Sequence, residues 1–88
     1  MIIELTKSFE KDVLKIRDKK VSDQLSKVLK NLSTCTDLTQ IAQLKKMKAV
    51  KNYYRIRVGD YRLGFKLESN IVILIRFLDR KDMYKYFP

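Results

Sequence analysis

The sequence predicts an α+β fold, in which a short N-terminal strand and a helical hairpin pack on a small antiparallel β-sheet. Apolar residues recur at helical spacing as far as about residue 33, and from Tyr53 onward the pattern changes to the alternation of strands. A length of 88 residues suits one modest core. We therefore expect residues 1–88 to form a single domain.

The first third of the chain predicts one strand and two helices. The apolar segment Ile2 to Leu5 precedes Thr6 and Ser8, either of which could cap a helix. Spacing of i, i+4 and i+7 then predicts a helix at about 7–18. The same pattern predicts a second helix at about 20–33.

The middle of the chain is polar, and we expect a loop there with one turn of helix within residues 39–47. Alternation predicts strands from Tyr53 to Val58 and from Tyr61 to about Leu67, joined by the two-residue turn Gly59-Asp60.

A third strand, from Ile71 to about Leu78, is apolar on both faces. A three-residue loop of Glu68, Ser69 and Asn70 would keep its odd-numbered members on the face of Leu63 and Phe65. Those members are Ile71, Ile73, Ile75 and Phe77.

Composition narrows the class of partner. The chain carries 20 Lys and Arg against 10 Asp and Glu, a net charge of +10, which favours polyanions. It has no histidine and one cysteine, Cys35, so we expect no disulfide, metal site or cofactor. No apolar run is long enough to cross a membrane, and we expect a cytoplasmic protein.

Arginines gather on the polar face of the predicted hairpin. The two-residue turn places Arg57 opposite Arg62 and Arg55 opposite Gly64, and the three-residue loop would place Arg76 beside Arg62. Like charges that face each other on a sheet cost stability, so a sequence shaped by folding alone would tend to alternate their signs. The row of arginines therefore favours binding of a polyanion, most simply RNA. Gly64 would leave open space beside Arg55 for a ligand. The alternative is an ordinary solvated outer face.

Other residues could extend this surface. Tyr53 shares the basic face and could stack on a base. Tyr84 and Tyr86 follow the last strand, where they could simply pack a C-terminal tail. A lysine run ahead of the hairpin is either solvated surface or part of a phosphate-binding track; it comprises Lys45, Lys46, Lys48 and Lys51.

The segment Tyr53 to Leu63 (YYRIRVGDYRL), with LKKM upstream and DRKDMY downstream, resembles the RelE/ParE superfamily of type II toxins. The resemblance covers nearly the whole chain, and RIRVGDYR is its most specific part. Similarity to the RelE branch implies a ribosome-dependent mRNA endonuclease, an mRNA interferase, that inhibits translation and is restrained by an acidic antitoxin.

The resemblance also implies which residues act on RNA. The catalytic residues would be Arg57, Arg62, Arg80 and Tyr84. The RNA-binding residues would be Arg55, Lys45, Lys46, Lys48, Lys51, Tyr53, Arg76 and Lys81. Metal-free cleavage needs a base, and arginine is a poor one.

The chain departs from the best-known RelE pattern at the position of the base. That pattern has lysines where this chain has Arg55 and Arg57, and many relatives have histidine in place of Asp79. Tyr84 and Lys51 are the two residues that could replace this base, and we prefer Tyr84. A ParE-like inhibitor of DNA gyrase and a catalytically inert RNA-binding relative remain alternatives.

Overall fold

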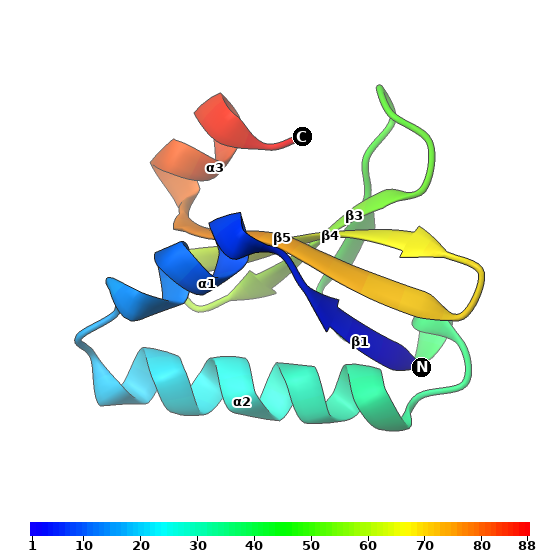
Figure 1. The fold of residues 1–88 in the computed structure, drawn as a ribbon, viewed down its shortest axis with the longest axis horizontal. Helices are drawn as coiled ribbons and strands as arrows, with labels where there is room; N and C mark the ends of the chain where they lie inside the picture. Colours follow the sequence, from blue (N-terminus) through cyan, green and yellow to red (C-terminus); the bar gives the residue numbers. More distant parts are fainter.

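A five-stranded sheet in the order β1-β5-β4-β3-β2 forms the centre of the molecule (Figure 1). The structure is a computed structural model that describes all 88 residues. The strands are β1 (Ile2–Leu5), β2 (Leu44–Lys46), β3 (Tyr53–Val58), β4 (Tyr61–Glu68) and β5 (Ile71–Asp79). The helices are α1 (Lys7–Leu14), α2 (Lys19–Thr34), the 3₁₀ turn η1 (Leu38–Gln40) and α3 (Arg80–Tyr86). The predicted α+β class is confirmed.

The two N-terminal helices begin at side-chain caps. Thr6 Oγ1 accepts a hydrogen bond from the Phe9 amide at 3.1 Å, and Asp18 accepts one from the Lys20 amide at 2.9 Å. Helix α1 ends at Leu14, earlier than predicted, because the chain must turn before the cap of α2. The helices run in opposite directions, as the predicted hairpin requires (Figure 1).

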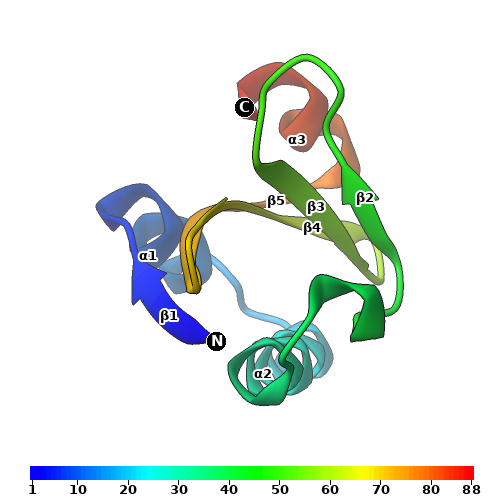
Figure 2. The ribbon, with the colours of Figure 1, turned by 90° about the vertical axis from the view of Figure 1, so that its right-hand side faces the viewer.

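The core lies between α2 and one face of the sheet. Leu25 and Leu32 of α2 are buried there. The buried members of the sheet are Ile56, Val58, Leu63, Phe65, Val72, Leu74 and Phe77. Helix α3 lies on the opposite face of the sheet (Figure 2). No helix has the length and apolar character needed to span a membrane.

The predicted register between β4 and β5 is wrong. Their connection is the two-residue turn Ser69-Asn70, with Glu68 opposite Ile71, and an irregularity at Gly64 and Phe65 leaves Ile75 without a partner. A bulge of this kind inserts one residue and reverses the alternation. Val72, Leu74 and Phe77 therefore reach the core. The predicted core members Ile71, Ile73 and Ile75 are only half-buried.

Two elements were not foreseen from the sequence. Strand β2 pairs with β3 in a segment where a loop with one turn of helix was expected; the only helical turn nearby is the 3₁₀ turn η1, which ends at Gln40, at the start of that segment. The C-terminal tail forms α3, whose first turn is capped by Asp79 through a 3.0 Å hydrogen bond from the Asp82 amide. Both elements carry side chains to the polar face of the hairpin.

Candidate nucleic-acid interface

The β3–β4 hairpin places three arginines on the face of the sheet away from α2. Arg57 lies opposite Arg62, and Arg55 lies opposite Gly64, as the two-residue turn predicted. The alternate residues Ile56 and Val58 are buried in the core. The alternation of the strand therefore sends the arginine side chains to the other face.

The hairpin turn holds the Arg62 guanidinium. Its Nη1 atom donates hydrogen bonds to the carbonyl of Gly59 at 3.0 Å and to that of Tyr61 at 2.9 Å. Gly59 has φ +61°, a left-handed conformation that glycine adopts without strain. Burial, followed by repulsion from Arg57, lowers the pKa of Arg62, although a guanidinium stays charged at neutral pH.

Arg55, Arg57 and Arg62 together form what we call the arginine site. Strand β2 closes this site on its outer side. Lys45 lies opposite Arg55. A cavity of about 250 Å³ is lined by these two residues together with Gln43, Leu44, Arg57 and Arg62. Four of the six lining residues are cations and none is an acid. The electrostatic field of this cavity therefore favours an anionic group such as a phosphate.

Helix α3 brings two further candidates to the edge of this arginine site. The Arg55 Cζ atom lies 5.2 Å from the centre of the Tyr84 ring, within cation–π range. Tyr84 is 59% exposed, so its hydroxyl is accessible to a ligand. The pKa of Tyr84 is lowered first by Arg80, whose guanidinium can hydrogen-bond the phenolate and attracts it by charge, and then by Arg55 and Arg62.

Two expectations about this face are wrong. Arg76 does not join the row, because Leu78 stands opposite Arg62 and Arg76 stands opposite Gly64. Its guanidinium is paired with Asp12, with 2.8 Å between Nε and Oδ2. The space over Gly64 is also filled, since a Cβ atom there would lie 2.7 Å from the Phe87 ring. Gly64 accommodates a side chain of its own protein and leaves no room there for a ligand.

The remaining candidates lie around the site. Lys48 and Lys51 belong to the β2–β3 loop, where they line a separate open cavity of about 560 Å³ with Lys46, Met47 and Val50. Lys51 does not line the arginine cavity. Tyr53 is half-buried, with its ring centre 5.8 Å from that of Phe87. Lys81 is exposed on the first turn of α3.

Gln43 is a lining residue that sequence reasoning missed. It has φ +62°, and its carbonyl accepts a hydrogen bond from the Arg57 amide at 3.2 Å. A strand of three residues is too short to show an alternating pattern, so no sequence signal identified this edge.

The chain is similar to known toxins over its whole length. Residues 3–84 match the family model of the ParE toxin of the type II toxin–antitoxin system parDE. Toxin RelE3 of Methanocaldococcus jannaschii is 35% identical over 89 residues, which cover all of both chains.

Solved structures share the fold. The RelB–RelE antitoxin–toxin complex from Methanococcus jannaschii contains a chain that is 32% identical, with a TM-score of 0.82 over 97% of this chain and 99% of that one. YafQ from E. coli matches at 20% identity and a TM-score of 0.75, over 93% of this chain and 96% of that one. YoeB from Staphylococcus aureus matches at 21% identity and a TM-score of 0.71, over 89% of this chain and 94% of that one. The last two support the fold alone.

Proposed function

Because this chain belongs to the RelE/ParE superfamily of type II toxins, we propose that it is a ribosome-dependent mRNA endonuclease that inhibits translation. The observation that carries the proposal is the cavity lined by Lys45, Arg55, Arg57 and Arg62, with Arg80 and Tyr84 of α3 beside it. Such a site can hold a phosphodiester and supply a proton acceptor without a metal ion.

In the proposed reaction the RNA 2′-oxygen attacks the adjacent phosphorus. The bond from phosphorus to the 5′-oxygen breaks, leaving a 2′,3′-cyclic phosphate and a 5′-hydroxyl. The Tyr84 phenolate takes the proton of the 2′-hydroxyl, since nearby cations lower its pKa. Arg57 and Arg62 stabilise the negative charge on the phosphorane. Arg80 stabilises the departing 5′-oxygen, which takes its proton from water.

The full-length similarity to toxin RelE3 supports the RNA target over the alternatives. In the same proposal the protein acts in the cytoplasm, and an antitoxin restrains it. The similar RelB–RelE structure is an antitoxin–toxin complex. A partner with acidic segments fits the site, because opposite charges speed and direct association. An antitoxin segment covering Arg57 and Arg62 would block RNA.

Growth arrest tests the proposed site in cells. Arg57→Ala and Arg62→Ala should each abolish arrest, because each removes a cation from the phosphate cavity. Arg17→Ala is the matched control, since Arg17 is exposed in the connection between α1 and α2. Full toxicity of both site variants, at wild-type protein levels, would rule the site out.

The match to a ParE family model favours inhibition of DNA gyrase as a second function. A supercoiling assay with purified gyrase separates the two. Inhibition of supercoiling, without cleavage of ribosome-bound message, would establish the gyrase function. Binding to the programmed ribosome without either effect would identify an inert RNA-binding relative.

A further inference from the structure

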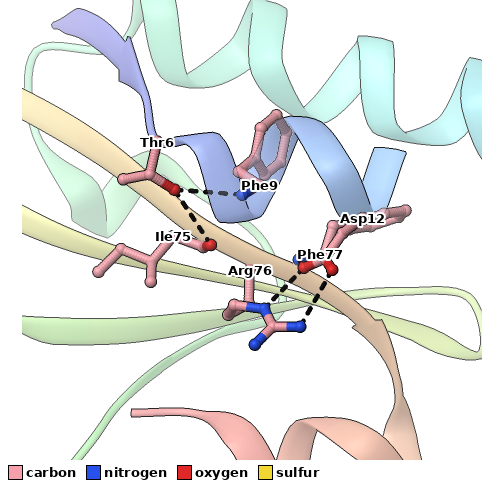
Figure 3. Close-up of polar contacts among 6 residues, drawn as sticks. All are labelled: Thr6, Phe9, Asp12, Ile75, Arg76 and Phe77. Atoms are coloured by element: carbon pink, nitrogen blue, oxygen red, sulfur yellow. Dashed lines mark hydrogen bonds and ion pairs between the residues drawn. The ribbon is translucent and has the colours of Figure 1, made fainter. Parts of the chain in front are cut away.

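The outer edge of β5 is covered by a strand for only part of its length. β1 ends at Leu5, opposite Leu74, and helix α1 continues along the edge beyond that point. Thr6 Oγ1 donates a hydrogen bond to the carbonyl of Ile75 at 3.3 Å (Figure 3). The Phe77 amide donates one to Asp12 Oδ2 at 2.9 Å. Side chains of α1 and its cap thus satisfy the bulged part of β5.

The Asp12 carboxylate also fixes the side chain of Arg76. Oδ2 accepts a hydrogen bond from Nε at 2.8 Å and Oδ1 accepts one from Nη2 at 3.0 Å, a bidentate arrangement that sets the plane of the guanidinium (Figure 3). Asp12 is only 4% exposed. Buried ion pairs of this kind often add little stability over apolar residues of equal size. We therefore assign the Asp12–Arg76 pair the role of fixing the orientation of the guanidinium.

The fixed guanidinium meets helix α3. Arg76 Cζ lies 5.7 Å from the centre of the Tyr86 ring. On the same helix Tyr84 makes the corresponding contact with Arg55, at 5.2 Å. A helix of seven residues is not stable alone, so its orientation depends on tertiary contacts. Two arginine–tyrosine contacts thus connect α3 to the sheet, one at the arginine site and one at Arg76.

We propose that Arg76, held by Asp12, is a positioning residue for RNA cleavage: its guanidinium supports the Tyr86 ring, and helix α3 thereby holds Arg80 and Tyr84 at the arginine site. The inference rests on the function proposed above. The rival explanation is that the buried side chains of Met83 and Phe87 are sufficient to orient the helix.

The test removes the contact at the exposed end of the helix, because Asp12 is buried and its loss would also destabilise the fold. Tyr86→Leu removes the ring, Tyr86→Phe retains it, and Arg76→Lys keeps the charge but removes the planar group. Lys85→Ala is the matched control on the exposed surface of α3. Tyrosine labelled with ¹³C at Cζ reports the titration of Tyr84 by NMR, with the signal assigned through Tyr84→Phe.

We expect the Tyr84 pKa to rise toward its ordinary value in Tyr86→Leu and Arg76→Lys. The phenol would move away from Arg55 on β3 and Arg62 on β4, while Arg80 on its own helix moves with it. Single-turnover cleavage should fall about tenfold to a hundredfold with unchanged affinity for the ribosome, as expected for displaced catalytic groups. Tyr86→Phe and Lys85→Ala should resemble wild type.

Wild-type titration of Tyr84 in both Tyr86→Leu and Arg76→Lys would overturn the positioning role. This readout does not depend on RNA cleavage. A wild-type protein that fails to cleave ribosome-bound message would refute the proposed function, and the NMR titration would still decide whether Arg76 orients α3.

Discussion

Replacing Gly64 by alanine tests how helix α3 is seated on the sheet. A Cβ atom at this position would lie 2.7, 2.7 and 2.8 Å from three carbons of the Phe87 ring. These distances are too short for any carbon–carbon contact, so the ring must leave its site. Phe87 is 6% exposed, and returning such a side chain to water costs about 1.5–3 kcal/mol.

Alanine offsets part of this cost. Gly64 is not in a left-handed conformation, and alanine is favoured over glycine in a strand by roughly 0.5–1 kcal/mol. We therefore expect Gly64→Ala to lower the free energy of unfolding by about 1–2 kcal/mol. In a Phe87→Ala background the obstacle is gone, and the same substitution should stabilise the protein by about 0.5 kcal/mol.

Urea denaturation followed by circular dichroism measures all four proteins of this cycle. The reversal of sign between the two backgrounds is the signature of a direct contact, because independent positions give additive changes. An equal loss in both backgrounds would refute the close approach of Phe87 to Gly64. RNA cleavage should fall with Gly64→Ala, since the displaced ring no longer anchors the end of α3.

The site and its supports make four further predictions. Asp12→Ala should cost about 1–3 kcal/mol of unfolding free energy, because it leaves the buried Phe77 amide without its acceptor and the partly exposed Arg76 guanidinium without its partner; a loss below about 0.5 kcal/mol in urea denaturation would show that these hydrogen bonds do not stabilise the fold. Tyr84→Phe should slow single-turnover cleavage by about 10²- to 10⁴-fold and remove its rise with pH, since only the phenolate accepts a proton; an unchanged pH profile would exclude Tyr84 as the base. Arg57→Ala should abolish cleavage yet stabilise the fold by about 0.2–1 kcal/mol through relief of repulsion from Arg62, so destabilisation in thermal melts would count against this pairing. Lys48→Ala and Lys51→Ala should leave the cleavage step intact, and each should reduce the dependence of log affinity on log salt by about 0.7 if the loop binds phosphates; an unchanged salt slope would assign these lysines to solvated surface.

The register of the β3–β4 hairpin could be predicted because a two-residue turn allows one pairing only. Arg57 opposite Arg62 follows directly from Gly59-Asp60. The register of β5 could not be predicted, because its apolar residues occupy both faces of the strand and do not show which face meets the core. The bulge that leaves Ile75 without a partner lies opposite Gly64 and Phe65, and the apolar residues of β5 do not show where the extra residue falls.

The parts of the site contributed by β2 and α3 depend on contacts that local patterns do not encode. Lys45 was a candidate only as part of a lysine run, and its place opposite Arg55 arises from a three-residue strand. The sequence pattern predicts Arg76 in the row with Arg62, because its partner Asp12 is 64 positions away in the chain and no local pattern links the two residues. Gly64 was expected to leave open space for a ligand, but the ring of Phe87, 23 positions further along the chain, fills that space.

Primer extension on a message bound to purified ribosomes shows directly whether the protein cleaves RNA with the residues of the arginine site. The wild-type protein, without added metal ions beyond those that the ribosome requires, should produce discrete cleavage in the message. Arg62→Ala and Tyr84→Phe should not produce it, whereas Arg17→Ala should cleave as wild type. Intact message with the wild-type protein, under conditions in which the protein is bound to the ribosome, would rule out RNA cleavage by this protein.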